Sequence, residues 1–179
     1  MSKRGRWLLV IGFIGIAICS WLYVWLFHPP IQILEMSIPE KYFPIGADYH
    51  PMYSNRDILP ALDSGNQTVR WSQLYGLTTF NVERLPTPGL ARRVYHLEED
   101  LDIYNLHPYS YYQSSVANDS VIGCGTFRFG GFRCAYTARY REYVTSLNVV
   151  VDDEMTIQDF EEIVQYIDNE FQLRLFIDE

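Results

Sequence analysis

Positively charged residues are scarce in this chain, and their positions are informative. The sequence has 179 residues with 14 Lys and Arg against 22 Asp and Glu, for a formal net charge of −8. Lys3, Arg4 and Arg6 precede the first apolar run, and residues 1–27 contain no acidic residue. Residues 28–179 therefore hold 11 basic and all 22 acidic residues, a net charge of −11. This balance excludes a polycationic nucleic-acid-binding protein.

The overall composition excludes a disordered polymer. Hydrophobic residues make up 48% of the chain and charged residues 20%, a balance typical of folded domains. The 152 residues that follow residue 27 suffice for one compact domain and hardly for two.

Signatures of catalysis and of metal binding are also missing. The chain has no G-x-S-x-G nucleophile elbow and no glycine-rich phosphate loop that opens a helix. Its four histidines show none of the paired spacing of zinc ligands, and two cysteines alone do not complete a structural zinc site. The sequence therefore predicts neither a metal nor a cofactor.

Two weak catalytic patterns remain. Residues 63–65 read Asp-Ser-Gly, as in the loop of aspartic proteases, but that chemistry needs two carboxylates and only one such loop occurs. His50 beside Asp48, or His96 beside Glu98, has the arrangement of an oriented base. We interpret residues 63–65 as a turn and the histidines as surface groups. We therefore expect no enzyme and assign no catalytic residue.

Only one long hydrophobic run is present, the 21 uncharged residues 7–27. A helix of this length crosses a hydrocarbon core about 30 Å thick. A cleaved signal peptide would have a shorter apolar stretch followed by a small-x-small site, and residues 17–19 lack that pair. We therefore predict an uncleaved transmembrane signal-anchor helix over residues 7–27, after a basic tip at residues 1–6.

The flanking charges predict the orientation of this span. Lys3, Arg4 and Arg6 precede it, and the next basic residue is Lys41. The positive-inside rule places the N-terminus in the cytoplasm and the remaining chain outside it. The sequence thus predicts a single-pass protein of the inner (plasma) membrane with a periplasmic or other extracytoplasmic domain.

Cysteine is rare, with three residues in the chain. Cys19 lies inside the predicted span, whereas Cys124 and Cys134 are the only two in the domain. In an oxidising compartment such a pair is expected to form a disulfide. A two-residue turn at residues 130–131 conflicts with this, because it sets Cys134 opposite Phe127. We favour the disulfide, which requires a different turn or a bulge.

Residue patterns predict an α+β domain. Residues 28–37 form a linker and a first strand, and residues 38–179 form the extracytoplasmic domain. We expect a turn or loop at residues 63–67. Further strands are expected over 77–85, in a hairpin over 125–136, and over 139–151. Residues 90–105 fit either a helix or strands, and we lean slightly to strands, with one at 101–106.

The C-terminal region predicts a helix on this sheet. Thr156 and Asp159 approximate a capping box. The apolar residues that follow recur as one helical stripe: Ile157, Phe160, Ile163, Val164, Ile167 and Phe171. The predicted fold is an N-terminal transmembrane helix followed by an antiparallel β-sheet domain covered by a C-terminal amphipathic helix.

The acidic residues of the C-terminal region are the sequence feature that points most directly to a function. Residues 152–179 contain ten acidic residues and one basic residue, Arg174. Such a patch either keeps the surface soluble or steers and pairs with a basic partner. Tyrosines offer contact area at low entropic cost, and a sugar-stacking platform is a weaker interpretation of them. We therefore predict partner contacts at Tyr109, Tyr111, Tyr112, Asp152, Asp153 and Glu154.

Three segments carry a resemblance to known proteins. They are IPEKYF at residues 38–43, ARYREYV at 138–144 and MTIQDFEEIVQYID at 155–168. They resemble small uncharacterised envelope proteins of proteobacteria, some of which look like periplasmic immunity proteins that neutralise toxins of type VI secretion systems. The matching residues are packing and turn residues, so the resemblance implies no particular site residue.

The sequence thus predicts a membrane-anchored extracytoplasmic binding protein, with an immunity or inhibitor role as its sharpest form. The partners would be the membrane, through one span, and a protein with a basic surface. One alternative is a structural or accessory subunit of an envelope complex, in which residues 7–27 make contacts. Another is an unrecognised periplasmic hydrolase with Asp63 or His50 in its site.

Overall fold

The computed structural model describes residues 12–16, 18–19, 30–55, 60–72, 76–98, 107–108, 112–126 and 131–175. The chain divides into two compact units, Met1–Ile31 and Gln32–Glu179. In the first unit, residues 12–16 and 18–19 are helical. The predicted span over residues 7–27 lies largely outside the described residues. Within the described part of the chain, none of the helices has the length and apolar character needed to cross a membrane.

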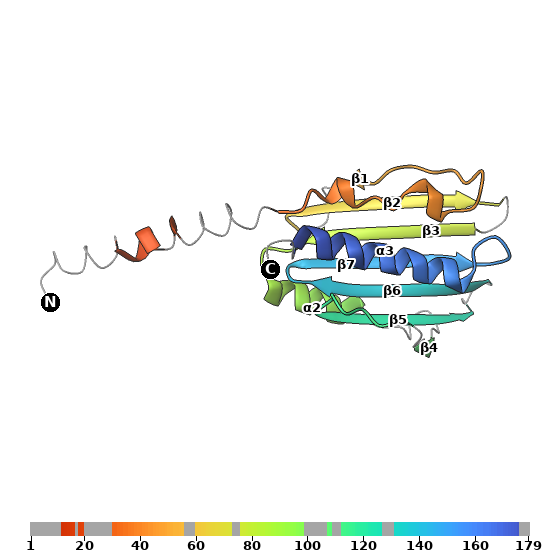
Figure 1. The fold of residues 1–179 in the computed structure, drawn as a ribbon. Coiled ribbons are helices and arrows are strands. Elements are labelled where there is room, and N and C mark those ends of the chain that lie inside the picture. Colours follow the sequence, from red (N-terminus) through yellow and green to blue (C-terminus); the bar gives the residue numbers. More distant parts are fainter. Residues whose placement is uncertain are drawn as a thin grey trace, which may run out of the picture. The chain divides into compact units, whose positions relative to one another are not determined.

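The second unit is built on an antiparallel sheet, with the described strands in the order β1-β2-β3-β7-β6-β5-β4 (Figure 1). These strands are β1 (Tyr53–Ser54), β2 (Asp63–Trp71), β3 (Gly76–Arg84), β4 (His107–Pro108), β5 (Asp119–Thr126), β6 (Phe132–Tyr140) and β7 (Tyr143–Val151). The helices are the 3-10 helices η1 (Ile33–Met36) and η2 (Glu40–Tyr42), α2 (Pro88–Glu98) and α3 (Ile157–Leu175). The predicted α+β class, with an antiparallel sheet and a C-terminal helix, is confirmed.

In the described part of the second unit, α2 and α3 cover opposite faces of the sheet. Successive strand residues point to opposite sides, so the side chains of Tyr143 and Val144 in β7 lie on opposite faces of the sheet. Phe171 of α3 contacts Tyr143, with ring centroids 5.9 Å apart. Val144 instead belongs to a buried cluster with Ala91 and Tyr95 of α2. Figure 1 shows α3 lying over β6 and β7.

The predicted start and apolar stripe of α3 are both confirmed. The Thr156 N–H donates to Asp159 Oδ2 at 2.7 Å, and the Asp159 N–H donates to Thr156 Oγ1 at 3.2 Å, which completes a capping box. The buried apolar residues of the helix are Phe160, Ile163, Val164, Ile167 and Phe171. Burial of this stripe against the sheet is the main force that holds α3 in place.

One carboxylate is buried within this apolar interface. Asp168 is buried, with only 1% of its surface exposed. Its Oδ1 accepts hydrogen bonds from the hydroxyls of Tyr136, at 3.1 Å, and Tyr140, while its Oδ2 accepts from Tyr112. Burial raises the pKa of all three phenols, and the charge of Asp168 raises these pKa values further. The cluster joins α3, β6 and the segment before β5.

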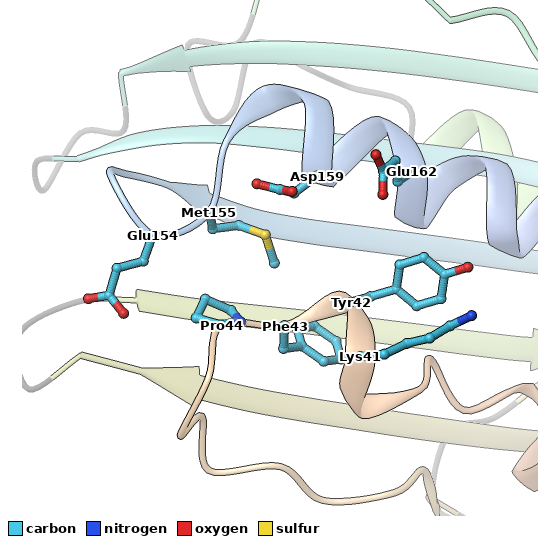
Figure 2. A pocket seen from close by; sticks show the side chains of 8 residues that line it. All are labelled: Lys41, Tyr42, Phe43, Pro44, Glu154, Met155, Asp159 and Glu162. Atoms are coloured by element: carbon cyan, nitrogen blue, oxygen red, sulfur yellow. The ribbon is translucent and has the colours of Figure 1, made fainter.

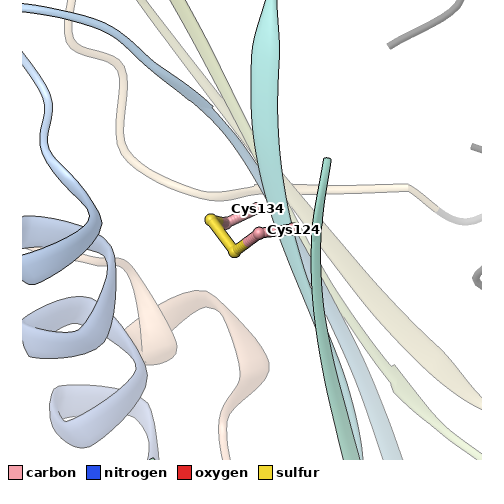
Figure 3. The surroundings of a disulfide bond; sticks show 2 residues. All are labelled: Cys124 and Cys134. Carbon is pink, nitrogen blue, oxygen red and sulfur yellow. A yellow bond between two sulfur atoms is a disulfide. The ribbon is translucent and has the colours of Figure 1, made fainter. Parts of the chain in front are cut away.

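The predicted disulfide is formed. Cys124 of β5 and Cys134 of β6 are direct partners in the sheet, with an S–S distance of 2.03 Å and a Cα–Cα distance of 4.1 Å. The last pair of this hairpin is Thr126 with Phe132. Its connection therefore comprises residues 127–131, which removes the register conflict of a two-residue turn at 130–131. Figure 3 shows both sulfurs on the side of the sheet where α3 lies.

Two predicted elements are wrong near the N-terminal part of the domain. The first strand predicted within residues 28–37 is not formed by the described residues 30–37, because Ile33 and Met36 are buried at the three-residue spacing of the 3-10 helix η1. Residues 63–67 are not a turn but the first half of β2. Gly65 lets Met52 and Ile33 pack closely there, since an added Cβ would lie 2.4 Å from the Met52 sulfur and 2.6 Å from Ile33 Cγ2. Turn-forming residues thus serve here to admit close packing.

The slight preference for a strand over residues 90–98 is also wrong. This segment belongs to α2, in which Leu90 N–H donates to Thr87 Oγ1 at 3.2 Å. Thr87 therefore caps the helix, and Pro88 occupies its first position, where proline is favoured. The strand predicted at residues 101–106 lies outside the described residues.

Candidate functional site

A cleft of about 120 Å³ opens between η2 and the beginning of α3. Its lining combines three carboxylates, one ammonium and an apolar floor: Lys41, Tyr42, Phe43, Pro44, Glu154, Met155, Asp159 and Glu162. Figure 2 shows the residues of the N-terminal segment on one side, those of α3 on the other, and the Met155 side chain directed between them. The cleft therefore joins two segments more than 100 residues apart in the sequence.

The N-terminal wall is fixed by contacts with α3. The rings of Tyr42 and Tyr166 lie 5.2 Å apart, and the Tyr166 hydroxyl donates to the Ser37 carbonyl at 3.2 Å. Burial, and next the nearby charge of Glu170, raise the pKa of Tyr166 to about 12. Arg174 adds an ion pair to Glu35 at 2.8 Å.

A buried amide fixes the same wall to the sheet. Gln67 of β2 is 0% exposed. Its Oε1 accepts from the Ile38 N–H at 2.8 Å, and its Nε2 donates to the Ile38 carbonyl at 3.0 Å and to the His50 carbonyl at 3.1 Å. Because the side chain satisfies backbone groups of the incoming segment, it sets the position of that segment before η2.

The second wall is fixed by Asp152. Its Oδ1 accepts from the N–H groups of Glu154 and Met155, each at 2.9 Å, and its Oδ2 accepts from the Trp71 indole N–H at 3.1 Å. This carboxylate therefore shapes the turn between β7 and α3 and anchors it to β2. Asp159 is similarly engaged in the capping box.

The cleft has an apolar floor and a negative rim. Met155 and Phe43 are buried, at 1% and 7% exposure, whereas Glu154 and Glu162 are exposed. The Lys41 ammonium lies 4.8 Å from the centre of the Tyr42 ring, a cation–π contact. The arrangement suits the aliphatic stem and cationic head of a lysine or arginine side chain supplied by another molecule.

The predicted partner-binding residues are found in different environments. Tyr109 and Tyr111 lie outside the described residues. Tyr112 is half-buried and donates its hydroxyl to Asp168. Asp152, Asp153 and Glu154 are all exposed in the turn after β7. The Asp152 carboxylate accepts a backbone hydrogen bond within that turn. Of the six predicted residues, Glu154 lines the cleft.

Sequence reasoning missed the other cleft residues. Asp159 and Glu162 belong to the acidic C-terminal region, and helical spacing, which places them on neighbouring turns, is the signal that relates them. Lys41 and Tyr42 belong to an irregular segment, and no local pattern brings them to α3. Only the long-range contacts of this segment do so.

The weak catalytic candidates do not assemble into a site among the described residues. His50 Nε2 lies 3.2 Å from Asp48 Oδ1, with both side chains about two-thirds exposed, at 67% and 70%. Asp63 is exposed at the start of β2, and the Ser64 hydroxyl donates to the Asn55 carbonyl. His96 contacts Tyr95 edge-on, with centroids 5.5 Å apart. No cluster of three metal-ligating side chains occurs in the described ranges.

Comparison with protein-family models, with curated proteins and with solved structures found no match for this chain.

Proposed function

We propose that this protein is a non-enzymatic binding protein whose extracytoplasmic domain binds a basic partner through the cleft between η2 and α3. The observation that carries the proposal is the pairing of an apolar floor with the carboxylates of Glu154, Asp159 and Glu162. An immunity or inhibitor role is its sharpest form, in which the partner is an incoming effector whose surface is blocked.

The arrangement of charges supports this proposal. The domain carries a net charge of −11 from residue 28 onward, and a field of one sign accelerates encounter with an oppositely charged partner. Three hydrogen bonds of Gln67 and three of Asp152 hold the walls in place. A cleft whose walls are already ordered loses less entropy when it binds.

The membrane anchor predicted over residues 7–27 supports the same function. A tethered domain reaches a high local concentration at the membrane surface. A soluble effector that approaches this surface would therefore meet the acidic domain before it reaches targets at the bilayer. The predicted anchor keeps the binding protein where such protection is needed.

Binding of an arginine-rich peptide to the full-length chain tests the proposal. Glu162→Gln removes one charge from the cleft, and Asp63→Asn removes one charge from the opposite end of the sheet. We expect Glu162→Gln to weaken binding by about two- to fivefold, as expected for one exposed ion pair. The double variant Glu154→Gln/Glu162→Gln should weaken it further and reduce its salt dependence.

The Asp63→Asn control distinguishes binding in the cleft from a general effect of net charge. Asp63→Asn should leave the affinity for the peptide close to that of the unaltered chain. Equal effects of Asp63→Asn and Glu162→Gln would mean that the peptide responds to net charge alone, and the cleft would lose its proposed role.

A further inference from the structure

A second cavity, of about 480 Å³, lies at the β1–β2 edge of the sheet. It is lined by Asp48, His50, Pro51, Tyr53, Thr68 and Arg70. Thr68 and Arg70 alternate along β2 with the buried residues Gln67 and Val69. Because alternate strand residues point to opposite faces, the cavity opens on the face away from α3. Its volume is in the range of small-molecule sites, about 300–1,000 Å³.

Backbone pairing brings opposite charges to this cavity. The Asp48 N–H donates to the Arg70 carbonyl at 2.7 Å, and the Arg70 N–H donates to the Asp48 carbonyl at 3.3 Å. Direct partners in an antiparallel bridge carry their side chains on the same face. Arg70 is exposed, and within the described ranges its guanidinium forms no ion pair. The Asp48 carboxylate pairs with His50 at 3.2 Å.

This charge arrangement restricts the class of ligand. A ligand of either sign would meet a like charge, from Arg70 or from Asp48. A neutral ligand rich in hydroxyl groups avoids this conflict, because each hydroxyl both donates and accepts hydrogen bonds. The cavity supplies acceptors in Asp48 and in the Thr68 hydroxyl oxygen, and donors in Arg70 and His50.

An aromatic ring and a proline provide apolar surface beside these polar groups. Tyr53 is 55% exposed, and Pro51 lies in the same lining. A tyrosine offers a rigid face for C–H groups and keeps a hydroxyl for hydrogen bonding. Sugar rings present this combination of a C–H face and a rim of hydroxyls.

A line of polar side chains continues from the cavity across the sheet. Thr68 Oγ1 donates to Asn66 Oδ1 at 3.2 Å, and Asn66 Nδ2 donates to Asn81 Oδ1 on β3. Asn81 Nδ2 in turn reaches Ser146 Oγ on β7 at 3.4 Å. All four residues are half-buried on the face that holds the cavity. This line orients Thr68 and extends the polar surface beyond one sugar ring.

We propose that this cavity is a saccharide-binding site, in which Tyr53 stacks on a sugar ring and Asp48, Thr68 and Arg70 bind its hydroxyl groups. The site is independent of the acidic cleft, because the two open on opposite faces of the sheet. An extracytoplasmic domain with both sites would hold a glycan on one face and a protein on the other.

The test is binding of a trisaccharide of N-acetylglucosamine, and separately of maltotriose, to the full-length chain by calorimetry. We expect at least one of them to bind, and Tyr53→Ala to weaken that binding about tenfold or more. Tyr53→Phe should retain most of the affinity, because it keeps the ring. Arg70→Ala should weaken binding as well. A loss of binding in both variants would not be explained by a folding defect caused by the substitution at position 53.

Two controls separate this proposal from the others. Glu162→Gln, in the acidic cleft, should not alter saccharide binding, so failure of one site leaves the other testable. Inorganic phosphate and spermidine serve as an anionic and a cationic probe. The proposal is overturned if neither trisaccharide binds, if Tyr53→Ala and Arg70→Ala leave binding unchanged, or if an ionic probe binds more tightly with the same dependence on Arg70.

Discussion

Asp168 shows how one charged residue stabilises the contact between α3 and the sheet. A carboxylate that is 1% exposed is costly unless it is hydrogen-bonded, and three tyrosine hydroxyls supply those bonds. The hydroxyl oxygens of Tyr136 and Tyr140 also lie 2.8 Å from each other. Removal of the Asp168 carboxylate would therefore leave the tyrosine hydroxyls of this cluster without a good acceptor.

Asp168→Asn should lower the free energy of unfolding by about 1–3 kcal/mol, because a neutral amide accepts hydrogen bonds less strongly and its N–H₂ faces hydroxyl donors. Urea denaturation measures the change. Asp153→Asn is the matched control, since Asp153 is exposed, and it should remain within about 0.5 kcal/mol of the unaltered chain. Equal midpoints for the two variants would contradict the structural role of Asp168.

The buried phenols should make the domain sensitive to alkali. Burial raises the pKa of Tyr136 and Tyr140 above the ordinary value of 10.0. Above about pH 10 the unfolded chain releases these protons while the folded chain keeps them, so stability that is fully present below that pH falls as the pH rises.

Denaturation midpoints measured from about pH 8 to 11 test this sensitivity. The fall in stability should be smaller in Tyr136→Phe, which has one fewer phenol to ionise, than in Tyr53→Phe, where the altered ring is exposed. The same alkaline slope in both variants would rule out the buried cluster as its source.

Elements with a local signal were predictable from the sequence. The stripe and the Thr156 cap define α3, and β-forming residues define β3, β6 and β7. β5 begins at Asp119, six residues before the predicted hairpin. The Thr87-Pro88 pair also marks the start of α2, but the alternation of residues 93–97 obscured it. Here a helix start signal was the better guide than the apolar pattern.

Elements determined by distant contacts were not predictable. β2 begins with turn-forming residues and is a strand because it pairs with β3 along its whole length, while Gln67 binds the backbone of Ile38 and Gly65 makes room for Met52. The acidic cleft likewise depends on contacts between Tyr42 and Tyr166. Among the described acidic residues of the C-terminal region, Asp152, Asp159, Asp168 and Glu170 accept hydrogen bonds within the domain, which a charge count does not reveal.

The β5–β6 hairpin should depend measurably on its disulfide. Reduction opens a loop closed by residues ten apart in sequence, which in the chain-entropy model costs about 2–3 kcal/mol of stability. Urea denaturation with and without a thiol reductant measures the loss. In Cys124→Ala/Cys134→Ala the reductant should have no effect, and a stability loss in that variant would show that the reductant acts elsewhere.

At the scale of the whole molecule, the proposed topology predicts the redox state of the domain. In a Cys19→Ala background, a chain with residues 1–27 should have Cys124 and Cys134 oxidised, because its domain faces an oxidising compartment. The same chain without residues 1–27 should keep both thiols reduced in the cytoplasm. Alkylation of free thiols, read as a mass shift on denatured protein, distinguishes the two states. Free thiols in the longer chain would contradict an extracytoplasmic domain.

Binding of a basic partner between η2 and α3 can be located by amide chemical-shift mapping of the chain with an arginine-rich peptide. The shifted amides should cluster around Lys41, Tyr42, Glu154, Met155 and Glu162, which line the cleft, and Glu162→Gln should reduce those shifts. Shifts centred on the opposite end of the sheet, or spread evenly over all acidic residues, would contradict binding in the cleft.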